Sequence, residues 1–434
     1  MKSEILKRAK GVRDFAPKEK KARDKIVKTL RQVFESFGYN PIETPIIERY
    51  DLFASKFGPG QESDAMKESF KLQDQGGRDL VLRTEFTVPF ARYVGMNPNM
   101  KMPFKRYQIG QVFRDGPVKL GRYREFWQAD IDMVGVKSTN ADAEILQLIY
   151  EVFEKLDLEI TISLNNRKVI NSILKYAGLT EDLFATTIIT LDKLEKMGQS
   201  KVIEELKAKG LKEDQVETII KTINIQGSNR EKISNLREIL GDDSGLDELE
   251  RTIKGVLNNE SIEFIPSLAR GLDYYTGNIF EVFLKDQSEL DSSLAGGGRY
   301  DKMISGFLNS KKEYPAIGVG FGLETVFEAM KLNKRIVQDE KAVAQVYFVP
   351  FEKKYYFRAL EAASELRKAG LNTDINLSEK KIKQALDFAN AYNIPYVVLI
   401  GEDEDKQKKY SLKNMKTGEQ DLLTLNQILE KINK

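Results

Sequence analysis

Three segments of the chain concentrate side chains that could bind and activate a small charged ligand. The densest is residues 269–277, Ala-Arg-Gly-Leu-Asp-Tyr-Tyr-Thr-Gly, in which Arg270 lies close in sequence to the phenols of Tyr274 and Tyr275. A buried guanidinium is costly unless an anion meets it, so Arg270 predicts a phosphate, a carboxylate or an acidic side chain beside it. For this segment taken alone, a strand end with packed tyrosines and a solvated arginine is the alternative.

The other two segments have the same character. Arg83 and Glu85 are two residues apart, so on a strand both would project to one side. The third segment contains Arg114, Gln128 and Asp132. Together the three segments offer guanidiniums, carboxylates, an amide and phenols, which suit a ligand with both an ammonium group and several negative oxygens.

The residue types that are missing narrow the chemistry further. The 434 residues include no cysteine and no histidine, which excludes disulfides, zinc sites built from thiolates or imidazoles, and imidazole bases. The sequence also has no Gly-x-x-x-x-Gly-Lys-Ser/Thr loop, so a P-loop site is not supported. We therefore expect chemistry by positioning and charge stabilisation, as in phosphoryl or nucleotidyl transfer, with no zinc and with Mg²⁺ arriving on a phosphate ligand.

Charge and hydropathy limit the possible partners and cellular locations of the protein. With 68 Lys and Arg against 66 Asp and Glu, the net charge of +2 means that a nucleic-acid partner would need local basic patches. The sequence has neither an N-terminal apolar run typical of a secretory signal nor a window near the ~18 apolar residues of a membrane span. We expect a cytoplasmic protein without a membrane partner.

The first 135 residues predict elements that would position the three segments. Apolar residues at helical spacing predict a helix over residues 20–37, stopped by Gly38 and followed by an extended piece to Pro45. Two strands between Phe104 and Gly135 flank a loop at 115–121. Period-two alternation separates their apolar residues (Trp127, Ala129, Ile131, Met133) from their polar ones (Arg106, Gln108, Arg114, Gln128, Asp130, Asp132). The polar face is either the floor of a wet cleft or a face that simply meets solvent.

The rest of the chain predicts an inserted region and a second domain. Residues from about 171 to 260 favour helices that form an insertion, after which strands return with glycine clusters at 296–298 and at 318, 320 and 322. Residues 331–341 form a polar linker. Residues 342–434 predict an α/β domain with a mixed sheet. Its expected elements are strands at 346–349, 373–375 and 396–400 and helices at 356–368 and 380–392.

Taken together, these segments resemble the histidyl-tRNA synthetase family of class II aminoacyl-tRNA synthetases. The resemblance begins at Lys10-Gly11-Val12-Arg13-Asp14 and continues through Leu82-Arg83-Thr84-Glu85-Phe86-Thr87, Phe113-Arg114 and Gly121-Arg122-Tyr123-Arg124-Glu125-Phe126-Trp127-Gln128. Residues 269–277 and Gly296-Gly297-Gly298-Arg299-Tyr300-Asp301 resemble the two signatures specific to the family. It implies an α+β fold: an antiparallel-sheet catalytic core at 1–330 with the helical insertion, and an anticodon-binding domain at 342–434.

The resemblance also implies a function and roles for individual residues. The protein would activate histidine with ATP to histidyl-adenylate and transfer histidine to tRNA(His), as a homodimer that uses the first helix and strand as its interface. Arg270 and Arg114 would be catalytic at the α-phosphate, and Arg122 would join them in binding ATP. Histidine would contact a set of seven residues: Thr84, Glu85, Phe86, Gln128, Asp132, Tyr274 and Tyr275.

Two departures from the family pattern concern the adenine of ATP. The third class motif ends in Gly322-Leu323-Glu324-Thr325, where the family has arginine in place of Thr325. Gly116 stands where an acid commonly follows Arg114 by two positions. An alternative is the histidine-binding regulatory paralogue of ATP phosphoribosyltransferase, which usually lacks the anticodon-binding domain and has degraded signatures. Here both that domain and the 269–277 segment are present.

Overall fold

The computed structural model describes residues 4–54, 67–270, 274–286, 290–336, 342–378 and 381–433. The chain divides into two compact units, Met1–Ile336 and Val337–Lys434. Within the described residues, no helix combines the length and the apolar character that crossing a membrane requires.

The first unit is built on a mixed sheet in which the described residues supply eight strands. In order across the sheet these are β1 (Asn40–Pro41), β5 (Phe104–Phe113), β6 (Glu125–Val134), β11 (Ala316–Gly322), β10 (Ala295–Arg299), β9 (Asn278–Leu284), β7 (Ile160–Asn166) and β8 (Ile262–Phe264). The pairs from β5 to β7 are antiparallel, whereas β1 and β8 join the edges in parallel. The two strands expected between Phe104 and Gly135 are therefore the neighbours β5 and β6.

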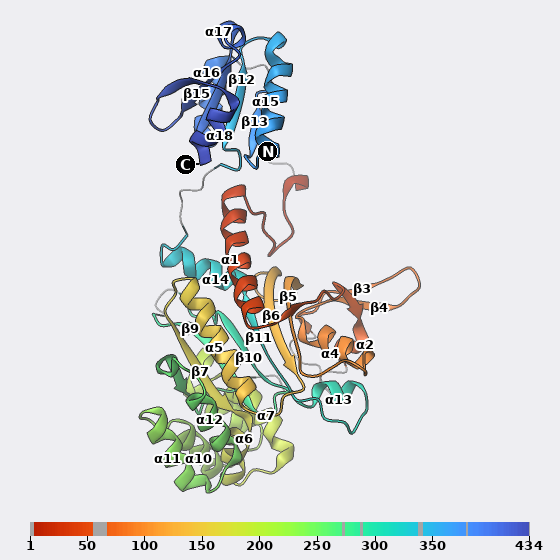
Figure 1. The fold of residues 1–434 in the computed structure, drawn as a ribbon. Coiled ribbons are helices and arrows are strands. Elements are labelled where there is room, and N and C mark those ends of the chain that lie inside the picture. The colour runs from red at the N-terminus through yellow and green to blue at the C-terminus, as the bar shows by residue number, and fades with distance from the viewer. Residues whose placement is uncertain are drawn as a thin grey trace. The chain divides into compact units, whose positions relative to one another are not determined.

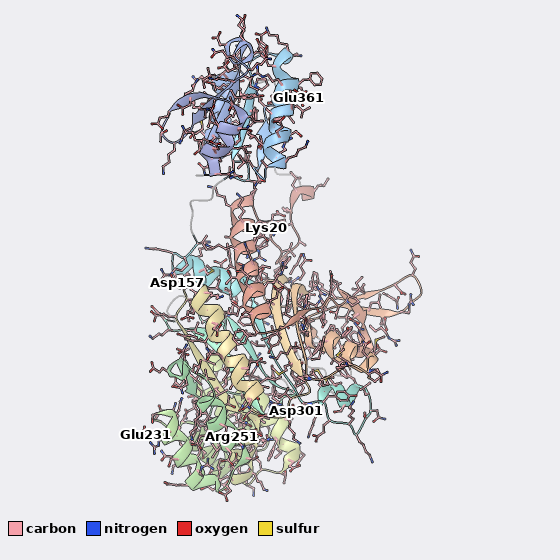
Figure 2. All side chains as sticks on the ribbon, in the orientation of Figure 1. Lys20, Asp157, Glu231, Arg251, Asp301 and Glu361 are labelled. Atoms are coloured by element: carbon pink, nitrogen blue, oxygen red, sulfur yellow. The ribbon has the colours of Figure 1, made fainter. Side chains whose placement is uncertain are left out.

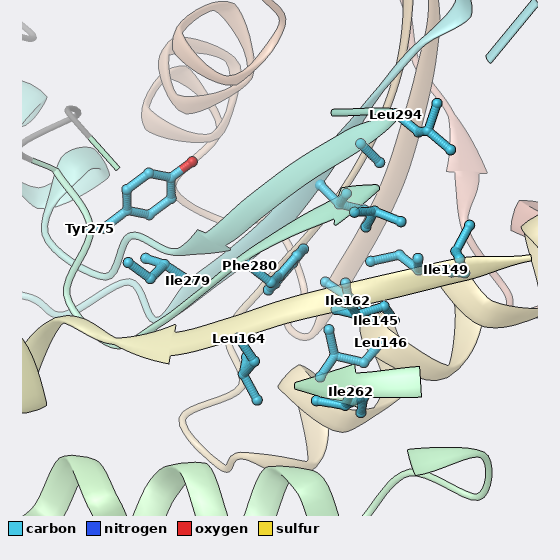
Figure 3. Packing of buried hydrophobic residues seen from close by; sticks show 14 of the residues in the cluster. Ile145, Leu146, Ile149, Ile162, Leu164, Ile262, Tyr275, Ile279, Phe280 and Leu294 are labelled. Carbon is cyan, nitrogen blue, oxygen red and sulfur yellow. The ribbon is translucent and has the colours of Figure 1, made fainter. Parts of the chain in front are cut away.

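One face of this sheet is apolar and carries the main core. Helices α1 (Pro17–Ser36), α5 (Asn140–Lys155) and α14 (Leu323–Leu332) pack on it, with Ala129, Ile131 and Met133 of β6 in the same buried cluster. Figure 3 shows part of this core, where α5 meets β7 and β9. The alternation predicted for β6 is confirmed, because these three residues share the helix-covered face. Helix α14 extends to Leu332, so the first two residues of the expected linker are helical, and Leu332 packs against the core.

A smaller layer and the insertion complete the first unit. Strands β2 (Ile47–Arg49), β4 (Asp79–Leu82) and β3 (Lys71–Gln73) form a second sheet beside α2 (Tyr50–Ala54), α4 (Thr87–Met96) and α13 (Met303–Phe307). The insertion begins at α6 (Arg167–Tyr176), four residues before the expected start, because Asn166 caps the helix by accepting from the Lys168 amide. Its other helices follow in order along the chain: α7 (Phe184–Leu191), α8 (Leu194–Met197), α9 (Gln199–Ala208), α10 (Glu213–Ile223), α11 (Asn229–Leu240) and α12 (Ser244–Lys254). Figure 1 labels α7, α10, α11 and α12 among them.

The charged residues of the insertion are mostly on its outer surface. Glu231 of α11 and Arg251 of α12, both labelled in Figure 2, are exposed, whereas Ile219 of α10 and Leu249 of α12 are buried. The apolar stripes of these helices therefore face one another, and their charged stripes face solvent.

The second unit is a five-stranded mixed sheet with helices on both faces. Its order is β13 (Thr373–Ile375), β12 (Val346–Pro350), β14 (Tyr396–Ile400), β15 (Tyr410–Asn414) and β16 (Gln420–Leu423). Helices α15 (Tyr356–Lys368) and α18 (Leu425–Asn433) share a core with one face, and α16 (Ile382–Ala391) packs on the other. All five expected elements are found close to their expected bounds. The strands β15 and β16 and the helices α17 (Glu402–Lys406) and α18 were not anticipated.

The left-handed backbone of Gly38, which ends α1, can be tested by comparing it with a second glycine that also has free space around it. Gly38 has φ +78° and Gly306 lies within α13, and a β-carbon at either would meet nothing within 4 Å. Gly38→Ala should lower the free energy of unfolding by about 1 kcal/mol, because alanine is strained in the left-handed region. Gly306→Ala should leave it unchanged or raise it. The single tryptophan, Trp127 of β6, reports unfolding of this unit by fluorescence in denaturant, and equal effects of the two changes would contradict this account.

Candidate active site

The face of the large sheet opposite α1, α5 and α14 is polar, and its centre is bare backbone. The strand register places Gln108, Asp130, Gly320, Gly296 and Glu281 in one row across β5, β6, β11, β10 and β9. A neighbouring row holds Arg106, Asp132, Gly318 and Gly298. We call Gly296, Gly318 and Gly320 the glycine floor. Because adjacent strands lie ~4.8 Å apart, about 10 Å separates β6 from β10 across the floor.

Charged side chains lie directly on this floor. A β-carbon added to Gly296 would be 2.0 Å from Arg270 Nη1, and one added to Gly318 would be 2.1 Å from Asp132 Oδ1. Both distances are far shorter than any real contact of a β-carbon, so a side chain at either position would displace the charged group. The glycine clusters noted in the sequence therefore let an arginine and an acid approach the backbone on the same face of the sheet. The arginine lies over β10, and the acid extends from β6.

Arg270 is mostly buried on one side of the floor. Its Nη1 donates to the carbonyl of Phe280 at 3.1 Å and lies 3.3 Å from Glu281 Oε1, and its guanidinium carbon is 5.6 Å from the Tyr275 ring centre. Burial alone would lower the pKa of Arg270, but the charges of Tyr275 and Glu281 outweigh it and raise the pKa. The guanidinium is thus permanently charged and fixed in direction. The neighbouring residues 271–273 lie outside the described residues.

On the other side, β6 presents a wall of polar side chains. Asp132 pairs with the fully buried Arg106, whose Nη2 lies 2.5 Å from Asp132 Oδ2, and it also accepts a hydrogen bond from the Tyr300 hydroxyl. Burial raises the pKa of Asp132 to about 6, although Arg106 and Tyr300 both act to lower it. The polar face is therefore buried under other side chains, which rules out the simple solvent-facing alternative.

Tyr274 and Tyr275 lie beside the glycine floor, where a β-carbon on Gly298 would be 2.9 Å from Tyr275 Cδ1. Their ring centres are 4.6 Å apart, and the Tyr274 ring stands edge-on to that of Tyr300 at 6.2 Å. Burial raises the pKa of both phenols, with the charge of Glu85 acting in the same direction. Both hydroxyls thus stay protonated at neutral pH and can donate hydrogen bonds. Tyr275 also packs against the apolar core, where Figure 3 shows its ring and hydroxyl.

The segment 83–86 reaches the same pocket, but differently from the prediction. Strand β4 ends at Leu82, so Arg83 and Glu85 are not neighbours on one face of a strand. Arg83 is buried and donates to the carbonyls of Thr44 and Gln111, which makes it a structural group.

Glu85 stands at the start of α4. Its Oε1 accepts from the amide of Val88 at 2.9 Å, and its charge acts on Asp130, Asp132, Tyr274 and Tyr275. Phe86 is fully buried beneath Arg83, whose guanidinium carbon is 4.6 Å from its ring centre, and Thr84 is half-buried.

A second basic group lies at the end of β5. Arg114 and Arg122 flank one carboxylate, with Glu68 Oε2 at 3.1 Å from Arg122 Nη2 and at 3.8 Å from Arg114 Nε. Burial and the charge of Arg122 lower the pKa of Arg114 to about 10, with Glu68 acting against both. A β-carbon on Gly116 would lie 2.6 Å from Glu68 Oε2. The carboxylate of Glu68 therefore occupies the space above Gly116.

Comparison with known proteins shows the family to which the chain belongs. The family model described as histidyl-tRNA synthetase matches residues 11–326, and one described as anticodon binding domain matches residues 345–434. The chain belongs to the histidyl-tRNA synthetase family. Histidine--tRNA ligase 1 of Bacillus cereus is 40% identical over 420 residues, which cover 95% of this chain and 96% of the relative.

Solved structures of the family agree with the fold. The histidyl-tRNA synthetase from Nostoc sp. PCC 7120 superposes with a TM-score of 0.81 at 30% identity and covers 99% of both chains. An ATP phosphoribosyltransferase regulatory subunit/histidyl-tRNA synthetase from Bacillus halodurans C has a TM-score of 0.75 at 22% identity, covering 92% of this chain and 99% of that one. This second likeness shows the fold alone.

The remaining departure from the histidyl-tRNA synthetase pattern, at Thr325, has a simple local geometry. Thr325 Oγ1 donates to the carbonyl of Gly322, and a β-carbon on Gly121 would lie 2.9 Å from Thr325 Cγ2. The preceding Glu324 is buried and pairs with Arg23 of α1 at 2.7 Å. The short side chain of Thr325 thus binds the backbone at the start of α14 and lies in close contact with the Gly121 backbone.

Sequence reasoning missed three groups that take part in the pocket. Arg106 and Asp130 were placed on the polar face but given no role, and Glu281, which pairs with Arg270, was not singled out. The available signal was alternation, because an isolated acid within the apolar strand Asn278–Leu284 must face away from the core.

The glycine floor makes a direct prediction. A β-carbon on Gly320 would lie 2.5 Å from Gln128 Nε2 and 2.8 Å from Asp130 Oδ1, which are ends of side chains and can move. Gly320→Ala should therefore leave the melting temperature within a few degrees of wild type and weaken histidine binding at least tenfold, about 1.4 kcal/mol. Isothermal titration with histidine measures this, and Gly306→Ala serves as the control. Unchanged affinity would show that no ligand lies over the floor.

Proposed function

We propose that this protein is a histidine–tRNA ligase. It joins histidine to ATP, giving histidyl-adenylate and pyrophosphate, and then transfers the histidyl group to the 3′ end of tRNA(His), releasing AMP. The observation that carries the proposal is the position of Arg270, a fixed cation on Gly296 that faces the acidic wall of β6 across a floor of bare backbone. That arrangement suits a ligand that is cationic at one end and anionic at the other.

The amino acid would lie between β6 and the two tyrosines. Glu85 and Gln128 would bind the α-ammonium group, and Asp132 would accept a hydrogen bond from the imidazole. Tyr275 would contact the imidazole from the opposite side, and Thr84, Phe86 and Tyr274 would complete the pocket. The geometry supports these roles because Glu85 lies close enough for its charge to act on Asp132 and on both tyrosines.

The chemical step needs charge stabilisation more than acid–base catalysis. A carboxylate oxygen of histidine attacks the α-phosphorus of ATP, and pyrophosphate leaves with the bond electrons. Negative charge then builds on the α-phosphate oxygens, which Arg270 and Arg114 would contact, with Arg122 binding ATP beside them. ATP would be bound as its Mg²⁺ complex. Oxygen donors on the phosphates suit that ion, and the described residues contain no cluster of three or more acidic side chains placed to hold a metal.

The rest of the chain would serve tRNA and assembly. The second unit, which matches the anticodon-binding model, would bind the tRNA. Helix α1 and the strand after it would form a homodimer interface, and the enzyme would work in the cytoplasm. The presence of this unit favours a ligase over the regulatory paralogue of ATP phosphoribosyltransferase.

Arg270→Ala tests the proposed reaction. Removing this cation should lower the rate of histidine-dependent exchange of pyrophosphate into ATP by 10²–10³-fold, about 2.7–4 kcal/mol, because the charge that develops on the α-phosphate loses its partner. The control is Arg49→Ala, which removes an arginine whose ion pair with Asp51 is solvent-exposed. Wild-type protein that binds histidine tightly but shows neither exchange nor aminoacylation of tRNA(His) would favour the regulatory alternative.

Glu68→Gln tests whether Arg114 and Arg122 meet a phosphate. In the structure Glu68 neutralises both guanidiniums, so a polyphosphate must compete with its carboxylate. Glutamine keeps the shape and removes the charge, and the KM for ATP in pyrophosphate exchange should fall several-fold, with the KM for histidine unchanged. A higher KM for ATP would instead mean that Glu68 itself binds the nucleotide, as an acid at position 116 would.

A further inference from the structure

Asp130 is a buried acid that projects onto the glycine floor without a complete set of partners. Its side chain is 3% exposed, and a β-carbon on Gly320 would lie 2.8 Å from its Oδ1. Oδ2 accepts a weak hydrogen bond from Gln128 Nε2 at 3.3 Å, and Oδ1 has no hydrogen-bond partner among the described residues. Buried polar atoms are nearly always paired, so an unpaired oxygen over the glycine floor points to a ligand group that donates to it.

Among the described residues, no guanidinium forms an ion pair with Asp130. Arg106 of β5 is paired with Asp132, and Arg83 donates to the carbonyls of Thr44 and Gln111. The groups whose charges act on Asp130 or respond to it are Arg106, Asp132, Glu85 and Arg83. The guanidinium that acts most strongly on Asp130 is therefore already paired with another carboxylate, and Arg83 forms its hydrogen bonds to backbone carbonyls. An unpaired buried carboxylate costs several kcal/mol, and such a group takes up a proton instead. Burial raises the pKa of Asp130 well above its usual range, and the charges of Asp132 and Glu85 add to this effect, whereas Arg106 and the hydrogen bond from Gln128 act against it.

We propose that Asp130 holds a proton in the empty pocket and releases it when the α-ammonium group of the amino acid binds over Gly320. The O–H bond of the carboxyl breaks, the proton passes to solvent, and an N–H of the ammonium donates to the resulting carboxylate. The ammonium group of the ligand thus replaces the proton of Asp130, and the carboxylate is never buried without a positive partner. This inference rests on the proposed function and adds a residue that positions the amino acid.

The α-ammonium group is favoured over the imidazole because of what lies beside Asp130. Gln128 Nε2 and Asp130 Oδ1 meet over the same glycine, whereas Asp132 lies over Gly318 and is paired with Arg106 and Tyr300. Histidinol, which keeps the ammonium group, should therefore displace the proton. Imidazolepropionic acid, which lacks it, should not.

The experiment is isothermal titration of the full-length protein with histidine at pH 8 in two buffers that differ in ionisation enthalpy. The difference in heat between the buffers gives the number of protons released. Wild type should release more protons than Asp130→Asn, up to one for each histidine bound, and the variant should bind histidine at least tenfold more weakly. Equal proton numbers in the two proteins, or release with imidazolepropionic acid but not with histidinol, would overturn the proposal.

Thermal melting of the empty protein is the second measurement. An aspartate that stays protonated in the folded state loses its proton from the unfolded chain above about pH 4, so wild-type stability falls as the pH rises toward the folded-state pKa. Asp130→Asn lacks this penalty, and its melting temperature relative to wild type should increase from pH 5 to pH 8. Asp291→Asn, at an acid that is 83% exposed, should show no such trend. Absence of the trend in Asp130→Asn would mean that the empty pocket holds no such proton.

These outcomes distinguish a failure of the proposed function from a failure of the proposed role of Asp130. Wild-type protein that binds no histidine would refute the proposed function. Normal histidine binding with identical proton release in wild type and Asp130→Asn would refute only the role of Asp130.

Discussion

The site depends on one constraint, namely that charged side chains lie flat against strand backbone. Arg270 covers Gly296 while Gln128, Asp130 and Asp132 lean over Gly320 and Gly318. A methyl group at any of these glycines would push the charged groups away from the sheet. Because the register of β6, β11 and β10 sets the spacing between cation and acids, the hydrogen-bond ladder of the sheet itself fixes the geometry of the pocket.

The opposite face of the same sheet stabilises this unfavourable arrangement. Burying ions such as Arg106 and Asp132 costs free energy that their mutual attraction only partly offsets. Beneath them, the apolar residues of β6 and β11 are packed against α1, α5 and α14. Each strand therefore contributes to the core with one set of side chains and to the pocket with the alternate set. A shift of register by one residue would exchange the two sets and destroy both.

Much of this could be predicted from the sequence, for identifiable reasons. Alternation along β6 correctly separated Ile131 and Met133 from Asp130 and Asp132, because a strand allows only two faces. The resemblance to the family predicted the fold, since its motifs cover the first unit and the last domain as a whole resembles an anticodon-binding domain. Alternation could not show that β4 stops before Arg83, since a strand end depends on partner strands far away in sequence. Nor could it show that Glu68 lies above Gly116, because the two residues are 48 positions apart and meet only after folding.

The glycine floor also limits how such a pocket can change over evolutionary time. Its base has no side chains to exchange, so a new amino-acid preference can arise only through residues at the rim and the ends. Mutational variety would thus be confined to β6, the tyrosine pair and the start of α4, while the bare strands stay the same. A laboratory library aimed at altered selectivity would do best to randomise those surrounding positions and keep the three glycines fixed.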